Sequence, residues 1–233
     1  MIFVERFVQN ANLPESKVSE VIMSDYKPFL KKELEMMGIK VRVPKRLEFV
    51  KGSESYHADM AVCHLGGERF FYADEIDEIV TAGKPLLNVC IFGENVICNT
   101  KKAYKPLLEI LGKEGKRILH TNQSYAKCSS AVIGENALIT SDESIYRVCL
   151  KNNIDVLKIS FGDIELDGYD YGFIGGCCGF IDKKTLVFSG NINLHRNYEN
   201  IKAFANNYNV DIISLSNERL YDIGGILPVK EFL

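Results

Sequence analysis

One short pattern recurs along the 233 residues and constrains the fold more than any other feature. A polar turn is followed by a short apolar run and then by a small polar residue that can cap a helix. Residues 93–100, Gly-Glu-Asn-Val-Ile-Cys-Asn-Thr, resemble residues 134–142, Gly-Glu-Asn-Ala-Leu-Ile-Thr-Ser-Asp. Further copies occupy 67–74, 182–190 and, for the second half of the pattern alone, 21–25. Repetition of this kind indicates a repeated structural unit.

The residues on both sides of each turn predict the rest of the unit. Apolar segments precede the turns, as at 88–92 and 130–133, so each unit opens with a β-hairpin. After the second strand, apolar residues return with the spacing of one helix face, for example at 104, 107, 108 and 111. Closing apolar strands follow at 39–43, 117–120, 154–159 and 210–215. The unit is therefore strand–strand–helix–strand.

About five copies of this unit fill residues 1–233, which predicts a single α/β domain. The second copy has a short helix, over little more than 74–81, and the first copy lacks its opening strand. Residues 220–229 could supply that strand from the far end of the chain and close a ring without open sheet edges. The fold predicted is a five-fold pseudosymmetric α/β propeller of ββαβ units. The alternative is an ordinary α/β sandwich whose segments are similar by coincidence.

Composition excludes several classes of function. The net charge of −3 comes from interspersed acids and bases, and the one basic cluster, 113–117, lies in a predicted loop, so we expect no nucleic-acid partner. No stretch is long and apolar enough to span a bilayer, and the start of the chain lacks a secretory segment. We therefore expect a cytoplasmic protein whose seven cysteines are free thiols. Phosphate-binding loops and zinc-type Cys and His spacings are absent, so neither a cofactor nor a metal is predicted.

Aligning the repeats places four polar residues at equivalent points, early in the first strand of each unit. They are Asp59, Asn88, Ser129 and Cys177. In a ring of similar units such positions converge on the axis, so we predict that they line a small polar pocket together with His57. The alternative for Asn88 and Ser129 is that they only satisfy strand ends.

The run Gly-Gly-Cys-Cys-Gly at 175–179 is the most unusual local segment. Its glycines allow a close approach of backbone to a ligand, and a thiolate at Cys177 or Cys178 beside His57 would be an activated nucleophile. The competing interpretation is that both cysteines are small core residues at a crowded axis. Asp222, in a loop rich in Gly and Tyr, could bind a cationic ligand.

Two motifs resemble the pentein superfamily of guanidino-group-modifying enzymes. The first is His57-Ala58-Asp59, which is similar to the His-x-Asp of that superfamily, and the second is the segment 214–228 with its Gly224-Gly225 pair. The superfamily contains arginine and agmatine deiminases, dimethylargininases and amidinotransferases, together with a ribosome anti-association factor. The chain resembles a bacterial, mostly clostridial, branch of it. The resemblance implies that His57 shuttles protons and that Asp59 contacts a guanidinium.

The sequence departs from this superfamily at the nucleophile. There, Gly-Gly precedes the reactive Cys by a few residues, whereas here Pro228 stands near that place and no Cys follows Cys178. Two functions remain open. One is a channel binding a small cationic guanidino or amide ligand, with Cys-dependent, deiminase-like hydrolysis of non-peptide C–N bonds. In that case His57, Asp59 and Cys177 would be catalytic, and Asn88, Ser129, Cys178 and Asp222 would bind the ligand. The other is a non-catalytic module that binds a macromolecule.

Overall fold

A computed structural model describes residues 4–82 and 84–233. Three units have the predicted order of elements, and each forms a three-stranded sheet in which the first pair of strands is antiparallel and the second parallel. Their elements are β6 (Cys90–Phe92), β7 (Asn95–Cys98), α4 (Lys105–Lys113) and β8 (Arg117–His120); β9 (Ser130–Gly134), β10 (Ala137–Thr140), α5 (Glu143–Lys151) and β11 (Asp155–Lys158); and β13 (Cys178–Phe180), β14 (Thr185–Phe188), α6 (Tyr198–Asn207) and β15 (Asp211–Ser214).

The second unit is abbreviated, as the sequence predicts. A single turn of helix, α2 (Ala58–Ala61), leads into the antiparallel hairpin of β4 (Val62–Gly66) and β5 (Arg69–Tyr72). The helix that follows, α3 (Asp77–Ala82), is short, and no third strand joins this hairpin among the described residues.

The first unit is completed by the far end of the chain. Its own elements are β2 (Val18–Met23), α1 (Pro28–Met36) and β3 (Lys40–Arg42), and β17 (Ile226–Phe232) pairs antiparallel to β2. The preceding strand β1 (Glu5–Phe7) lies on the other edge of β17, so the sheet order is β1-β17-β2-β3.

The prediction for 220–229 is therefore right about the partner and wrong about the bounds. The strand begins only at Ile226, because Gly224 and Gly225, with φ of 75° and 83°, turn the backbone out of the extended conformation. The two residues of β16 (Leu220–Tyr221) pair instead with β12 (Ile164–Glu165).

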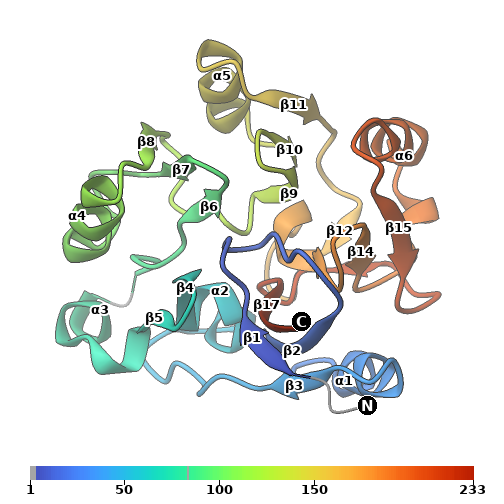
Figure 1. Ribbon diagram of the computed structural model, residues 1–233, viewed down its shortest axis with the longest axis horizontal. Helices are drawn as coiled ribbons and strands as arrows, with labels where there is room; N and C mark the ends of the chain where they lie inside the picture. Colours follow the sequence, from blue (N-terminus) through green and yellow to red (C-terminus); the bar gives the residue numbers. More distant parts are fainter. Residues whose placement is uncertain (1–3, 83) are drawn as a thin grey trace.

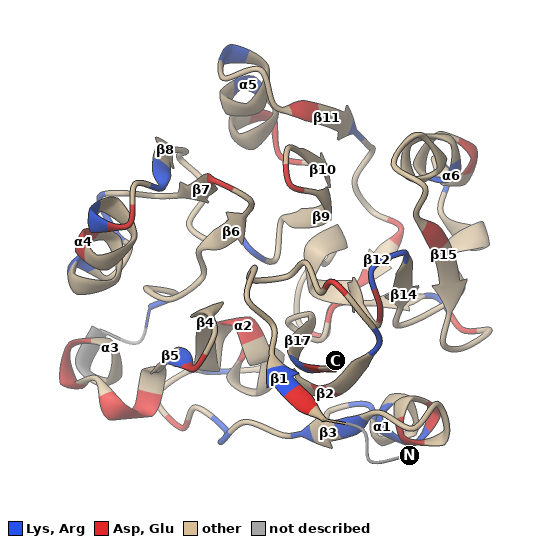
Figure 2. Ribbon diagram, viewed as in Figure 1, with Lys and Arg blue, Asp and Glu red and all other residues tan. Residues whose placement is uncertain are grey.

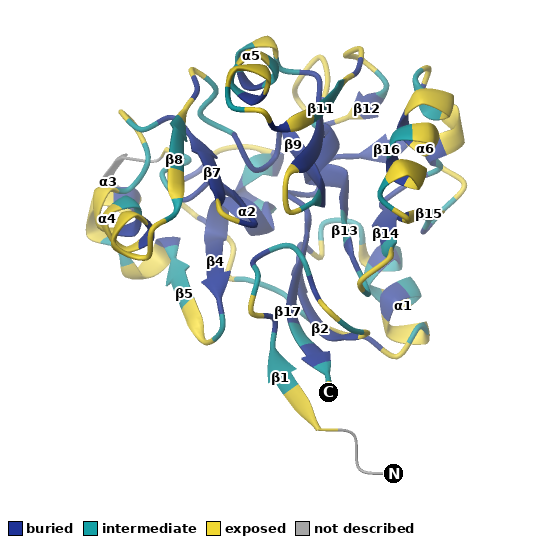
Figure 3. Ribbon diagram, turned by 45° about the horizontal axis from the view of Figure 1, so that its top comes forward, coloured by how far each residue is buried: buried dark blue, intermediate teal, exposed yellow. Residues whose placement is uncertain are grey.

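In space, the helices lie outside and the opening strands lie near the middle. Figure 1 shows α1, α3, α4, α5 and α6 at the periphery, with β17, β4, β6 and β9 nearer the centre. The described strands form six small sheets rather than one continuous hydrogen-bonded barrel. The longer helices α1, α4, α5 and α6 each bury one face against their unit, as Ile145 and Cys149 of α5 illustrate, and leave the other exposed (Figure 3).

Basic and acidic residues are interspersed over the elements (Figure 2). Within 4–82 and 84–233, no helix combines the length and the apolar character needed to cross a membrane.

One buried carboxylate connects the two ends of the chain. Glu231 is fully buried in β17 and accepts hydrogen bonds from the Arg6 side chain at 3.0 Å and from the backbone N–H groups of Glu15 and Ser16 at 2.6 and 2.8 Å. These bonds hold the segment between β1 and β2 against the C-terminal strand.

Replacing Glu231 with alanine should lower the free energy of unfolding by about 3 kcal/mol, because it removes the buried acceptor of three hydrogen bonds. Urea denaturation of both proteins measures the difference. The matched control is Glu5→Ala, whose half-exposed carboxylate makes one 4.0 Å contact with Lys230 and should cost less than about 1 kcal/mol. Equal losses for both variants would contradict a role for Glu231 in closing the sheet.

Candidate functional site

A turn between β16 and β17 positions the first carboxylate of the site. The side chain of Asp222 accepts hydrogen bonds from the backbone N–H of Gly224 at 3.0 Å and from that of Phe173 at 2.9 Å. The carbonyl of Gly224 accepts the N–H of Asp59 at 3.0 Å, and a Cβ on Gly224 would lie 2.5 Å from the His57 backbone. Glycine at 224 therefore allows the turn that carries Asp222 to pack directly on the segment His57–Asp59.

His57 and Asp59 are held at the start of α2. His57 is extended, with φ −63° and ψ 125°, and precedes the helix, while Asp59 lies in its only turn. Both side chains are buried, with 3% and 1% of their surface exposed. The Nδ1 atom of His57 lies 3.7 Å from the Oδ1 atom of Asp222. The His-x-Asp spacing thus places an imidazole and a carboxylate in the interior beside a second carboxylate.

The thiol in this site belongs to Cys128. It lies in the loop before β9, which Asn88 holds by accepting the backbone N–H groups of Lys127 at 2.8 Å and Cys128 at 3.2 Å. The Cys128 sulfur is 2.7 Å from Asp59 Oδ2, 3.8 Å from His57 Nδ1 and 3.9 Å from Asp222 Oδ1. His57, Asp59 and Cys128 form a group of potential metal ligands whose donor atoms all lie within 4.8 Å of one another.

Burial and charge control the protonation of this group. Burial raises the pKa of Asp59 to about 6, although the charges of His57 and Lys127 act to lower it. Burial also raises the pKa of the Cys128 thiol well above its usual value, and the carboxylates of Asp222 and Asp59 raise it further. The resting thiol is therefore neutral and donates to Asp59.

Two buried atoms of the site have no protein hydrogen-bond partner within the described chain. They are Asp59 Oδ1 and His57 Nε2. A buried polar atom without a partner costs about 1–3 kcal/mol, so such atoms are expected where a ligand is to be bound. Here one is an acceptor on the carboxylate and the other belongs to the imidazole.

The structure brings together four of the side chains predicted from sequence, namely His57, Asp59, Asn88 and Asp222. The Cys177 thiol instead donates to the carbonyl of Ile174 at 3.1 Å. No hydrogen bond joins Cys177 to His57 in the described part of the chain, and the thiol that lies beside His57 Nδ1 is that of Cys128.

The other two predicted ligand-binding residues are also buried. Cys178 begins β13, and burial raises the pKa of its thiol to about 12. Ser129 is fully buried, and its hydroxyl has no protein partner among the described residues. The repeat alignment selected Ser129 where the neighbouring Cys128 reaches the site. No periodicity fixes the register in this loop, and Ser129 stays a predicted ligand-binding residue next to Cys128.

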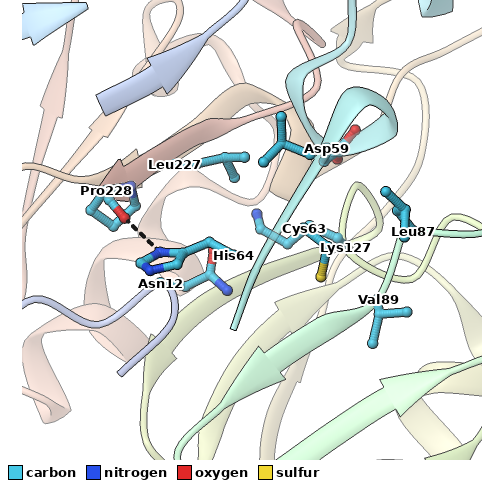
Figure 4. Close-up of a pocket in the computed structure, with 10 residues that line it drawn as sticks. Asn12, Asp59, Cys63, His64, Leu87, Val89, Lys127, Leu227 and Pro228 are labelled. Atoms are coloured by element: carbon cyan, nitrogen blue, oxygen red, sulfur yellow. Dashed lines mark hydrogen bonds between the residues drawn. The ribbon is translucent and has the colours of Figure 1, made fainter. Parts of the chain in front are cut away.

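A cavity of about 20 Å³ lies beside the cluster, with room for about one water molecule. Asp59, Lys127, His64 and Pro228 are among its lining residues (Figure 4). His64 is buried between the carbonyls of Pro228 and Gly67, at 3.3 and 3.0 Å. Side chains must therefore move to admit a ligand larger than water.

A family described as a family of unknown function (DUF6873) has a model that matches residues 83–227. No curated protein sequence matches the chain.

Several solved structures resemble this one. An inosamine-phosphate amidinotransferase from Streptomyces griseus is 12% identical, with a TM-score of 0.55 over 96% of this chain and 97% of that one. An amidinotransferase of the saxitoxin pathway from Microseira wollei is 12% identical, with a TM-score of 0.52 over 89% and 92%. DDAH from Pseudomonas aeruginosa, complexed with citrulline, is 10% identical, with a TM-score of 0.52 over 93% and 100%. At these identities the likeness concerns the fold.

Proposed function

Because the chain belongs to the family of unknown function DUF6873 and has the pentein fold of these amidinotransferases and of DDAH, we propose that it is a guanidino-group-modifying enzyme of the hydrolase type. In this proposal Cys128, rather than Cys177, is the nucleophile. The ligand is a small guanidino or amide compound bound at the centre of the molecule.

The observation that carries the proposal is the meeting of a thiol, an imidazole and two carboxylates in the interior. The Cys128 sulfur lies within 4 Å of His57, Asp59 and Asp222, which come from segments far apart in the sequence. A guanidinium is planar and presents N–H donors that match carboxylate oxygens. The unpartnered Oδ1 of Asp59 is an acceptor for such a donor.

The roles follow from the chemistry of each group. The Cys128 thiolate adds to the guanidinium carbon, and His57 gives a proton to the nitrogen that leaves as ammonia or an amine. Water then adds to the S-bound carbon, gives up a proton to His57 and releases the thiol. The net reaction converts a guanidinium and water into a ureido compound and an ammonium ion. Citrulline, the compound named with DDAH, is a ureido compound.

The charges of the site suit a cationic substrate. The negative charges of Asp59 and Asp222 both raise the pKa of the Cys128 thiol. A cationic substrate bound between the two carboxylates lowers that pKa again and so favours the thiolate that the reaction needs. Asn88 holds the backbone of Cys128 and so positions the nucleophile. Ser129 and Cys178 are not assigned a role in the reaction.

The repeat also supports a finer description of the fold. We propose that the five units are related by a pseudo-five-fold axis and that the cluster around Cys128 lies on it. The first unit draws β17 from the far end of the chain, as expected for a ring closed by its two ends.

Ligand binding tests the proposal. Agmatine, arginine and methylguanidine should raise the melting temperature of the protein and release ammonia or amine on incubation. In Asp59→Asn, affinity should fall about 30-fold or more, because a buried guanidinium loses a charged partner. An Asp170→Asn variant, altered at an exposed loop carboxylate, should behave like the unmodified chain. If no guanidine binds and the protein co-purifies with a macromolecule, the binding-module alternative replaces this proposal.

A further inference from the structure

We propose that the cluster around Cys128 also binds a single zinc ion, with His57, Cys128 and Asp222 as ligands and Asp59 as the fourth. Zinc and a guanidinium would occupy the same carboxylates, so binding of one excludes the other. The zinc site goes beyond the proposed function, since its formation does not require the chain to be an enzyme.

Three donor atoms form a nearly equilateral triangle. The Cys128 sulfur is 3.8 Å from His57 Nδ1 and 3.9 Å from Asp222 Oδ1, and these two atoms are 3.7 Å apart. A point equidistant from three atoms about 3.8 Å apart lies about 2.2 Å from each. Zinc binds sulfur at about 2.3 Å, nitrogen at about 2.0–2.1 Å and oxygen at about 2.0–2.2 Å. An ion at the centre of this triangle has near-correct bond lengths, and a contraction of the three separations to about 3.5 Å would move it out of the plane into a tetrahedral position.

Asp59 completes the ligand set. Its Oδ2 lies 2.7 Å from the sulfur, and its Oδ1 is buried without a protein partner in the described chain. A tetrahedral ion requires the oxygen and sulfur to separate to about 3.5 Å, given the zinc bond lengths. A small rotation of the Asp59 side chain about its own bonds would achieve this.

The donor types and their supports favour zinc over other common ions. Thiolate and imidazole suit zinc, whereas magnesium and calcium take oxygen ligands. Asp222 is held by the N–H groups of Gly224 and Phe173, as the outer hydrogen bonds of metal ligands usually are. The thiolate of Cys128 and the carboxylates of Asp59 and Asp222 carry three negative charges, one more than the zinc ion neutralises. The buried Lys127 nearby carries the balancing positive charge.

The test uses the full chain, freed of metal with a chelator. Zinc is titrated against a chromogenic chelator, and cobalt(II) is added separately to record its absorption spectrum. We expect one equivalent of zinc and a cobalt spectrum with a thiolate-to-metal charge-transfer band. Cys128→Ser should weaken zinc binding at least about 100-fold and abolish the band. Cys177→Ser, which removes a buried thiol outside the cluster, should leave both unchanged.

The outcomes separate this inference from the proposed function. A zinc-dependent loss of guanidine binding that a chelator reverses would support the shared site. A cobalt band that depends on Cys128, without any guanidine binding, would support the zinc site and reject the enzyme. Zinc binding that is absent, or equal in the Cys128→Ser variant, would overturn the inference. If the Cys128→Ser variant fails to fold, the cobalt spectrum of the unmodified chain still decides the question, because a missing thiolate-to-metal band would overturn the inference.

Discussion

Replacing Cys128 with serine is expected to lower kcat for guanidine hydrolysis at least about 1000-fold. Serine has nearly the same size and can still donate to Asp59, so the fold should persist, but a hydroxyl in this setting is a far poorer nucleophile than a thiol. The release of ammonia or amine from a saturating guanidine measures the loss. The binding of that guanidine, followed by thermal shift, should change much less than kcat.

The control for this variant is Cys177→Ser. The Cys177 thiol is as buried as that of Cys128 but donates to the carbonyl of Ile174. Its replacement should leave kcat within about threefold of the original value. If Cys177→Ser abolishes turnover and Cys128→Ser does not, the assignment of the nucleophile is wrong, and the Gly-Gly-Cys-Cys-Gly segment regains the role first suggested by its sequence.

The substitution Gly176→Ala should destabilise the protein by about 3 kcal/mol or more. A Cβ at this position would lie 1.9 Å from Asp222 Oδ1, well inside contact distance. The backbone cannot easily retreat, because the N–H of Gly176 donates to the Cys128 carbonyl at 2.9 Å and its own carbonyl accepts the N–H groups of Ile223 and Gly225. Denaturant unfolding measures the loss, and guanidine affinity should fall with it because Asp222 is displaced.

A glycine-to-alanine substitution in α4 should have the opposite effect on stability. Gly112 lies in α4, where an added Cβ would have an ordinary 3.7 Å contact with Ile118. Gly112→Ala should stabilise the protein by up to about 1 kcal/mol, since alanine is the better helix former. A loss for Gly176→Ala no larger than about 0.5 kcal/mol would contradict the tight packing of Gly176 against Asp222.

The sequence predicted much of the fold because local and repeated signals agree. Apolar alternation, turns and helical stripes all pointed to one unit, and α4, α5 and α6 each follow a hairpin as expected. The bounds of the last strand, β17, are harder to predict from the sequence. They depend on the left-handed conformations of Gly224 and Gly225, which a repeat alignment does not reveal.

Local sequence signals indicate part of the candidate site, and Asp222 was proposed from its loop rich in Gly and Tyr. The His-x-Asp spacing identified His57 and Asp59, and the repeat identified Asn88. The repeat alignment points to Ser129 and not to the neighbouring Cys128, because the loop before β9 has no regular period that fixes which residue faces the site. The Lys-Cys-Ser-Ser segment directly before an apolar strand was the one available signal. Distances among side chains from separate loops are set by tertiary packing, which sequence spacing does not report.

The sheet order β1-β17-β2-β3 has a consequence for the synthesis of the protein. A ribosome makes β1 and β2 well before β17, the strand that lies between them in the sheet. Asp222 likewise arrives long after His57 and Asp59. Such long-range pairing slows folding, since distant segments must meet before they stabilise one another. The first sheet and the site can therefore form only after β17 has been synthesised, and until then the edge of β2 that pairs with β17 stays unpaired and would have to be shielded by chaperones.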